Sequence, residues 1–204
     1  MTPPSLPSLS DLLSAAPFIV VALFAITFHE AAHAITAAAC GDDTAKSLGR
    51  ASLNPLRHIS PFGTIILPLL LYAFHSPFLF GWAKPVPVDW SKLRHWRSGM
   101  LLVAAAGPGA NLILAGLSAV ALTSVAGPAW LARTLQASLA LNLLLGLFNL
   151  IPVPPLDGSK ILAALLPERW ALPLAGLHRR QSPVKWISHR WLTGLPKPPA
   201  DPGV

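Results

Sequence analysis

The motif H-E-A-A-H at residues 29–33 lies inside an apolar stretch, residues 17–39, and constrains the fold more than any other feature of the chain. A helix needs about 20 apolar residues to cross a bilayer, and this stretch supplies them. Because residues four apart share one face of a helix, His29 and His33 can bind the same cation while Glu30 reaches water beside it. Two buried histidines without a metal are the alternative, but unpaired ionisable groups in hydrocarbon cost roughly 2.5 to 3.5 kcal/mol each on insertion scales. The motif therefore predicts a metal site within the membrane.

The composition indicates a single membrane module. Hydrophobic residues make up 53% of the chain and charged residues 11%, which is too apolar for an ordinary soluble domain. The N-terminus lacks the basic region and cleavage site of a secretory signal, so the first apolar stretch is expected to be a retained helix. We expect a short N-terminal segment, residues 1–16, a membrane-embedded core, residues 17–166, and a basic C-terminal tail rich in tryptophan and proline, residues 167–204.

Four apolar stretches define the predicted topology: residues 17–39, 61–80, 99–126 and 135–166. Prolines break the second stretch, so we expect it to be a re-entrant or interfacial segment. The predicted fold class is an all-α polytopic membrane protein with three full transmembrane helices, one broken or re-entrant segment and short strand-like interfacial loops. The first and last crossings then run parallel. Among the loops, residues 82–88 contain alternating proline and valine, which suits an extended edge strand that could hold an unwound peptide by strand addition. Simple anchoring at the membrane interface is the alternative role of this segment.

Basic residues predict the orientation in the membrane. They flank the broken stretch on both sides, whereas residues 1–16 contain none and the loop at residues 127–134 contains only Arg133. Because cytoplasmic loops carry the excess of Lys and Arg, both basic loops and the tail are predicted to face the cytoplasm. We expect a multi-pass protein of the cell membrane with its metal site toward the cytoplasmic side. The net charge of +7 is then explained by contact with anionic lipid and predicts no nucleic-acid partner.

A hydrolytic metal needs a third protein ligand, and Asp157 is the candidate. Glu30 and Asp157 are the acidic residues available within apolar sequence. Prolines between Asn149 and Asp157 break the helix and can aim the carboxylate inward, while Gly158 permits an unusual backbone angle. Asp157 could instead cap the helix expected at residues 158–166, but the need for a third ligand favours metal binding.

Three motifs occur along the chain in a defined order: H-E-A-A-H at residues 29–33, G-P-G-A-N at residues 107–111 and N-L-I-P-V-P-P-L-D-G at residues 149–158. Together they resemble the site-2 protease family of intramembrane zinc metalloproteases, over roughly residues 17–166. Residues 41–46, 49–50, 53–56 and 80–88 also look like the compact bacterial branch of that family, which lacks appended regulatory domains. The resemblance implies that His29, His33 and Asp157 bind Zn²⁺ and that Glu30 is the catalytic base.

Two asparagines match polar positions of the family that face the catalytic cavity, Asn111 and Asn149. An amide there could polarise the scissile carbonyl or stabilise the oxyanion. Buried asparagines on membrane helices also hold helices together by hydrogen bonds, so both interpretations stay open for each residue. Gly107 and Gly109 are expected to be close-packing positions.

The resemblance implies hydrolysis of peptide bonds within or near transmembrane segments. The expected partners are the lipid bilayer and a membrane protein substrate with a transmembrane helix, and no sequence feature indicates an oligomeric state. The alternative is a non-proteolytic membrane zinc-binding protein, such as a carrier or sensor. Glu30 argues against the alternative, because a carrier has little need for a general base beside its metal.

The chain departs from the family pattern in two places. Ser60 stands where relatives often carry aspartate, and residues 167–204 lack the further hydrophobic helix that relatives usually have. Glu168, the only later glutamate, could replace Asp157 as third ligand but is expected to be an interfacial charge. The single cysteine, Cys40, is expected to pack and not to bind metal.

Overall fold

A computed structural model of the chain describes residues 9–74, 76, 81, 83–124 and 126–167. Three of its helices are long and apolar enough to cross a membrane, by length and composition. They are α1 (Leu9–Ala39), α4 (Trp96–Ser124) and α5 (Ala129–Asn149). The expectation of an all-α chain with three long apolar helices is therefore confirmed for the described residues.

Two helix boundaries differ from those expected. Helix α1 contains Pro17 and takes in residues 9–16, so part of the expected N-terminal segment belongs to the first helix. Proline is tolerated inside transmembrane helices because neighbouring groups satisfy the backbone acceptor that it leaves free. Helix α5 begins at Ala129, earlier than the expected residue 135, so the expected loop at residues 127–134 is mostly helical. Polar side chains near Arg133 lower the hydropathy there, but at a helix end they can reach the interface.

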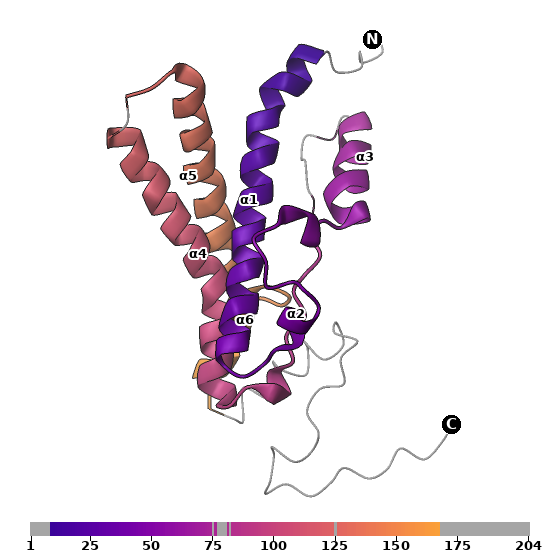
Figure 1. Ribbon diagram of the computed structural model, residues 1–204, viewed down its shortest axis with the longest axis vertical. Coiled ribbons are helices and arrows are strands. Elements are labelled where there is room, and N and C mark those ends of the chain that lie inside the picture. Colours follow the sequence, from indigo (N-terminus) through magenta and orange to yellow (C-terminus); the bar gives the residue numbers. More distant parts are fainter. Residues whose placement is uncertain (1–8, 75, 77–80, 82, 125, 168–204) are drawn as a thin grey trace, which may run out of the picture.

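The long helices alternate in direction, and α1 and α5 run parallel, as expected (Figure 1). Helix α4 lies centrally and packs against α1, α5 and the short helix α6 (Asp157–Leu165). Small side chains occupy these contacts, since Ala34, Ala37, Ala104 and Ala163 are buried almost completely. Small residues let membrane helices approach closely, and this approach brings α1, α4 and α6 together near one end of the molecule.

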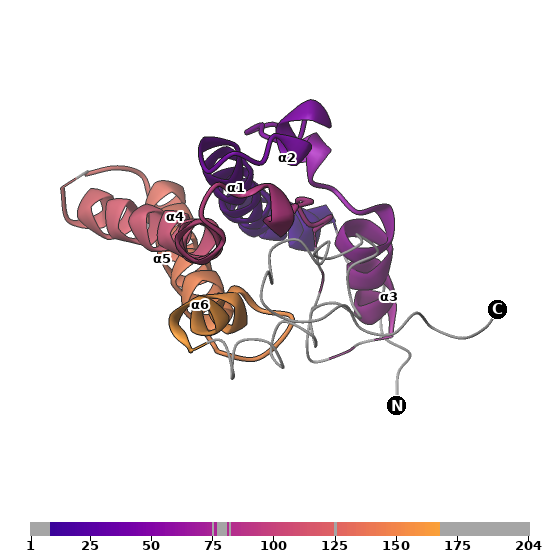
Figure 2. The same cartoon turned by 90° about the horizontal axis from the view of Figure 1, so that it is seen from below.

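The second apolar stretch forms a short arm. It consists of the π-helical turn η2 (Pro61–Ile66) and the helix α3 (Leu67–Ala73). At about 1.5 Å per residue the arm reaches roughly 20 Å, short of the ~30 Å of a hydrocarbon core. In the end-on view α3 lies apart from α4 and α5, with α1 between them (Figure 2). Residues 77–80, which would complete the predicted re-entrant segment, lie outside the described residues.

Short elements complete the end that carries α6. They are α2 (Thr44–Ser47), η1 (Pro55–Arg57) and η3 (Trp90–Lys92). No strand occurs among the described residues, so the expected strand-like loops are not seen, and residues 83–89 form a loop. Trp82, at the start of the expected strand, lies outside the described residues. Cys40 is partly buried against the core formed by Ala37, Leu93 and Met100, which confirms its packing role.

Candidate metal centre

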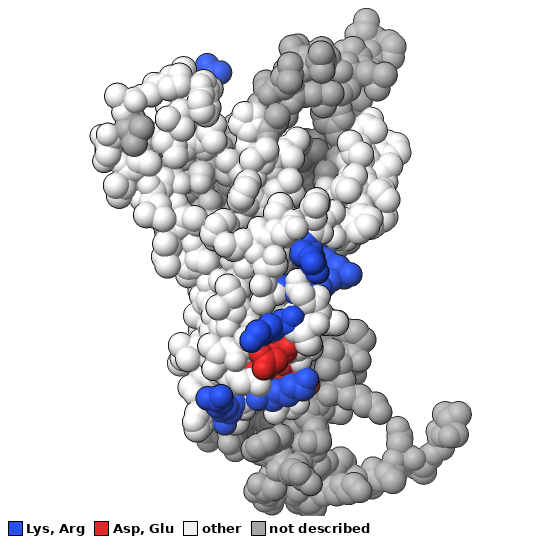
Figure 3. Space-filling view, in the orientation of Figure 1, with Lys and Arg blue, Asp and Glu red and all other residues white. Residues whose placement is uncertain are grey.

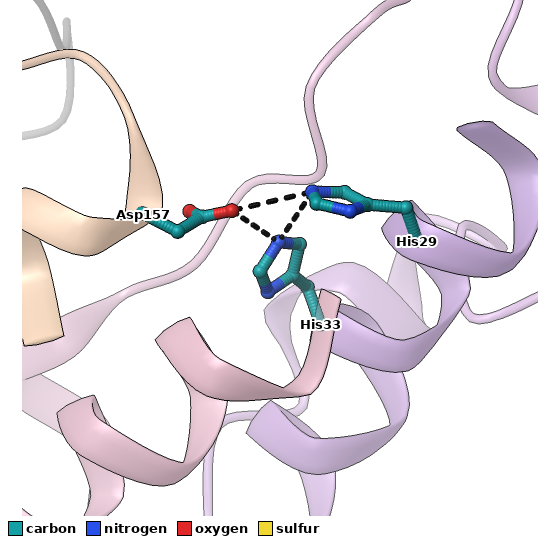
Figure 4. Close-up of side chains that lie close together, drawn as sticks. All are labelled: His29, His33 and Asp157. Atoms are coloured by element: carbon teal, nitrogen blue, oxygen red, sulfur yellow. Dashed lines mark hydrogen bonds and ion pairs between the residues drawn. The ribbon is translucent and has the colours of Figure 1, made fainter. Parts of the chain in front are cut away.

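Three side chains that sequence analysis selected as ligands converge in the structure (Figure 4). His29 and His33 lie one turn apart on α1, and Asp157 is the first residue of α6. The two Nε2 atoms are 3.1 Å apart, and Asp157 Oδ2 lies 3.2 Å from His29 Nε2 and 3.0 Å from His33 Nε2. All three side chains are buried.

These separations match the ligand sphere of a small tetrahedral cation. Ligand atoms about 2.0 to 2.1 Å from a tetrahedral zinc lie about 3.3 to 3.4 Å from one another. The three atoms of this site lie 3.0 to 3.2 Å apart, so a cation fits between them after small shifts. Three protein ligands leave one position open for water or substrate, as in hydrolytic zinc sites.

Hydrogen bonds at the other ring nitrogens orient both histidines. His29 Nδ1 donates to Asn111 Oδ1 at 2.6 Å, and His33 Nδ1 donates to the Val103 carbonyl at 2.7 Å. With the hydrogens on Nδ1, each neutral ring turns its Nε2 lone pair toward Asp157. Two nitrogen lone pairs and a carboxylate oxygen then face one point with no hydrogen between them. Such a set of acceptors is stabilised when a cation binds among them.

Gly107 on α4 leaves space for this point. A Cβ atom at residue 107 would lie 2.3 Å from His33 Nε2 and 2.7 Å from His29 Nε2. Any side chain at residue 107 would displace the two imidazole rings. The expected close packing at Gly107 is therefore confirmed, and the residues that pack against it are His29 and His33. At Gly109 a Cβ would meet no described atom within 4 Å, so the same expectation is wrong there.

The structure contradicts the capping interpretation of Asp157. The N-cap residue of α6 is Leu156, and the Asp157 carboxylate turns toward the histidines, so Asp157 does not cap the helix. The sequence predicted an unusual backbone angle at Gly158, but this residue does not have a positive φ, so the prediction is wrong. A different feature explains the glycine. A Cβ at Gly158 would lie 2.1 Å from the Leu150 carbonyl oxygen. The missing side chain therefore lets α6 start directly against the end of α5.

Lys160 binds the second oxygen of the same carboxylate. Its Nζ lies 2.8 Å from Asp157 Oδ1 and also sits over the ring of Trp90. Burial opposes the ionisation of Asp157, but its close contacts with the His29 and His33 rings and the charge of Lys160 outweigh it. The pKa of the Asp157 carboxyl is therefore held well below its usual range, and the group is a carboxylate at any physiological pH.

Glu30, the expected base, is held by the loop at residues 83–89. Its Oε2 accepts a hydrogen bond of 2.7 Å from the backbone N–H of Val86. Val86 stands between Pro85 and Pro87, which have no N–H, so it is the one residue of this tripeptide able to donate. The proline-valine alternation thus presents a single backbone donor to the carboxylate.

Three further contacts fix this loop. The Lys84 N–H donates to the His58 carbonyl at 2.9 Å, and Arg50 donates to the Pro85 carbonyl at 2.8 Å. The Asp89 N–H donates to the buried carboxylate of Asp42 at 2.6 Å. Contacts on both sides of Val86 therefore hold its N–H in place.

The two expected cavity asparagines take different positions. Asn111 is fully buried and contacts His29, as above. Its Nδ2 donates to the Ala25 carbonyl at 3.1 Å and to Asn142 Oδ1 at 2.8 Å, so it is engaged as both donor and acceptor. Asn149 Nδ2 donates to the Leu145 carbonyl on its own helix, and the described contacts do not join it to the three ligands.

Sequence reasoning missed several groups at the site. The Val103 carbonyl belongs to the backbone and leaves no trace in residue types. The Val86 N–H is also a backbone group, and its flanking prolines mark it as a donor without indicating its partner, Glu30. Lys160 and Asn142 could have been found, because a charge three residues after a ligand and an amide inside an apolar helix are both rare. Ser60 accepts a hydrogen bond from the Gly63 N–H, which gives it a local role at the start of η2. Glu168 lies outside the described residues.

The chain is similar to known proteins. Residues 128–175 match Peptidase family M50. The chain is 44% identical over 165 residues to "Putative zinc metalloprotease YwhC" of Bacillus subtilis (strain 168), covering 76% of this chain and 72% of that protein. It is 32% identical over 140 residues to "Putative zinc metalloprotease Rip2" of Mycolicibacterium smegmatis, covering 67% of this chain and 52% of that protein.

A third relative is "Putative zinc metalloprotease Rip2" of Mycobacterium tuberculosis (strain H37Rv), which is 35% identical over 150 residues. That match covers 72% of this chain and 54% of the relative, so the chain spans about half the length of the Rip2 proteins. No solved structure matches the chain. The extent of the match to YwhC, together with the match to the family itself, shows that the chain belongs to peptidase family M50, the site-2 protease family of metallopeptidases.

Proposed function

We propose that the protein is an intramembrane zinc metalloprotease that hydrolyses peptide bonds within or near transmembrane segments of membrane proteins. The observation that carries this proposal is the convergence of two Nε2 lone pairs, from a helix long enough to span a bilayer, with one carboxylate oxygen from α6. Relatives named as zinc metalloproteases support zinc as the cation. The family membership supports proteolysis as the reaction.

His29, His33 and Asp157 would hold the zinc ion, and the chemistry of the donor set fits it. Imidazole and carboxylate are common zinc ligands, and the three atoms already lie at about the spacing that tetrahedral zinc requires. When bound, Zn²⁺ polarises a carbonyl and lowers the pKa of water to about 7. Gly107 keeps the volume between the ligands open.

Glu30 would move the proton during hydrolysis. It is next to His29 in sequence, and its carboxylate is half-buried. Glu30 accepts a proton from the attacking water and later donates it to the nitrogen of the leaving amine. The bond from the Val86 N–H holds one carboxylate oxygen, which leaves the other oxygen to exchange the proton. Because one oxygen is held, the oxygen that exchanges the proton keeps a constant position.

A transmembrane helix is the expected substrate. The long helices expose large apolar side chains, including Phe18, Phe24, Ile113 and Leu117, which supports a position in lipid. The carbonyl groups of a substrate helix are occupied by its own hydrogen bonds, so the segment must unwind before cleavage. We expect helix-breaking residues near the cleavage site to increase the rate.

The active site is proposed to face the cytoplasm. Basic side chains gather in the half of the molecule that carries α2 and α6, while the opposite end is nearly free of them (Figure 3). In the cell membrane, such an excess of Lys and Arg marks the cytoplasmic side. A Cys40→Ser background with either Ser47→Cys or Ser124→Cys tests this, because both serines are exposed and lie at opposite ends. In intact cells an impermeant maleimide should label the cysteine at residue 124 and not the one at residue 47, and the reverse pattern would refute the orientation.

The variant Glu30→Gln tests the proposed function. The full chain is purified in detergent, its zinc content is measured, and it is incubated in proteoliposomes with a panel of single-span membrane proteins. Proteolysis predicts stoichiometric zinc in both forms and cleavage by the wild type, with at least about a thousandfold lower rate for Glu30→Gln. His33→Ala is the matched control that should lose both zinc and cleavage. Equal function of Glu30→Gln and wild type would instead favour a zinc carrier or sensor.

A further inference from the structure

A line of buried hydrogen bonds leads from the site into the interior of the helix bundle. His29 Nδ1 donates to Asn111 Oδ1 at 2.6 Å, and Asn111 Nδ2 donates to Asn142 Oδ1 at 2.8 Å. Asn142 Nδ2 then donates to the Ser138 carbonyl at 2.9 Å. Asn111 is 0% exposed and Asn142 is 2% exposed, so water does not replace these bonds. The line connects α1, α4 and α5 in sequence.

The direction of every bond in this line is fixed by its two ends. The Ala25 and Ser138 carbonyls can only accept hydrogen bonds, so the amide atom that faces each of them must be Nδ2. Asn111 therefore presents Nδ2 to Asn142 and Oδ1 to His29, and Asn142 presents Oδ1 in return. A reversed Asn111 amide would place its oxygen against two acceptors, the Ala25 carbonyl and Asn142 Oδ1.

We propose that Asn142 is a positioning residue for the metal ligand His29. It acts by holding the Asn111 amide in the one orientation that accepts the His29 Nδ1 hydrogen, which leaves the His29 Nε2 lone pair for the cation. The proposal rests on the proposed function, in which His29 binds zinc. Helix α5 supplies none of the three ligands, but through Asn142 it would help to set their geometry.

A helix-packing role alone would not produce this arrangement. Any polar pair across the α4–α5 contact could hold the helices together, and Ser118 with Ser138 does so at 2.8 Å on the same interface. Asn142 differs because its acceptor oxygen meets an amide whose other end touches a ligand. Partners that orient a metal-binding histidine typically change metal affinity by about 10- to 100-fold when they are removed.

The test measures metal binding by the full-length chain in detergent. The metal-free protein is titrated with Zn²⁺ against a chelator of known affinity, and with Co²⁺, whose visible absorption reports the coordination geometry. We expect Asn142→Leu to lower zinc affinity by about tenfold and to change the cobalt spectrum. Asn142→Asp, in its protonated form, keeps an acceptor oxygen for Asn111 and an O–H donor for the Ser138 carbonyl, so it should retain wild-type affinity and spectrum.

Ser118→Ala is the matched control, because it removes a hydrogen bond to Ser138 Oγ at the same helix interface and leaves in place both Ser138 oxygens that Asn142 Nδ2 contacts. It should keep wild-type zinc affinity and cobalt spectrum. Wild-type binding by Asn142→Leu, or an equal loss in Ser118→Ala, would overturn the positioning role. If Asn142→Leu does not fold, Asn142→Asp decides, since a tenfold loss in that isosteric variant also contradicts the proposal. Failure of the wild-type chain itself to bind zinc would overturn the proposed function, which distinguishes the two.

Discussion

Apolar residues are packed differently in two regions of the molecule. One region is the junction of α1, α4 and α6, which holds the candidate metal site, and the other is the η2–α3 arm. At the junction of α1, α4 and α6 the buried residues are mostly small, and helices approach closely enough for two histidines to meet Asp157. In the arm the large side chains face outward, with Leu69 62% exposed and Phe74 80% exposed. Within the described residues, η2 and α3 pack chiefly against each other.

The difference indicates that the junction fixes the positions of the ligands, whereas the arm presents an exposed apolar surface. A metal site needs its ligands held to within about 0.5 Å, and close helix packing with oriented hydrogen bonds achieves this. The arm does not hold any of the three ligands, so its apolar side chains are free to meet lipid or a substrate helix. Substitutions should therefore alter metal binding and stability at the junction and leave both nearly unchanged in the arm.

The largest effect is expected for Gly107→Ala, which tests whether the junction tolerates a single added carbon. The new Cβ would lie 2.3 Å from His33 Nε2, and the rings can turn away only by leaving the ligand positions. We expect a folded protein whose zinc affinity falls about 100-fold or more, measured by chelator competition. Gly109→Ala is the control on the same helix and should bind zinc like the wild type, because its Cβ meets no described atom within 4 Å. Equal zinc affinity in both variants would show that the junction tolerates the added carbon, contrary to the contrast drawn with the arm.

The next effect concerns the contact that places Asp157. In Gly158→Ala the Cβ would lie 2.1 Å from the Leu150 carbonyl oxygen and 2.4 Å from its carbon, and backbone atoms cannot turn aside. We expect unfolding free energy to fall by about 1 to 3 kcal/mol, seen as a lower Tm in detergent with and without zinc. Gly116→Ala, with open space around its Cβ, should instead leave Tm unchanged or raise it slightly. A wild-type Tm for Gly158→Ala would show that α6 does not depend on this contact.

A smaller effect is expected at the contact between the loop at residues 83–89 and the proposed base, Glu30. Val86→Pro deletes the one N–H that donates to Glu30 while keeping an apolar side chain. A hydrogen bond to a charged group contributes about 1.5 to 3 kcal/mol, so kcat should fall about tenfold or more with zinc content unchanged. Val86→Ala keeps the N–H and should retain kcat. A drop in both variants would mean that the valine side chain matters more than the donor.

The smallest effect is expected in the arm. Leu69→Ala should change unfolding free energy by no more than about 0.5 kcal/mol, because the side chain is 62% exposed. Its counterpart at the junction, Met100→Ala, should cost about 2 kcal/mol or more, since Met100 is 3% exposed. Thermal unfolding of the two variants side by side measures the contrast. Similar losses would indicate that the arm is packed as firmly as the junction.

The sequence alone determined the features that depend on local spacing. Apolar runs of sufficient length predicted three membrane-length helices, and the four-residue spacing of His29 and His33 predicted one shared face. The shortage of acidic residues in apolar sequence, together with the family motif, selected Asp157. These properties follow from the period of a helix and the cost of charge in lipid, which act on short stretches of chain.

Helix packing decided the rest, because it depends on contacts between distant segments. It brought Asp157, more than a hundred residues away, to 3.0 Å from His33. It also joined Asn111 to His29 and the Val86 N–H to Glu30, partners that no local pattern identifies. Backbone donors and acceptors are the same in every residue except proline, so the three-dimensional arrangement selects which of them orients a ligand or a base.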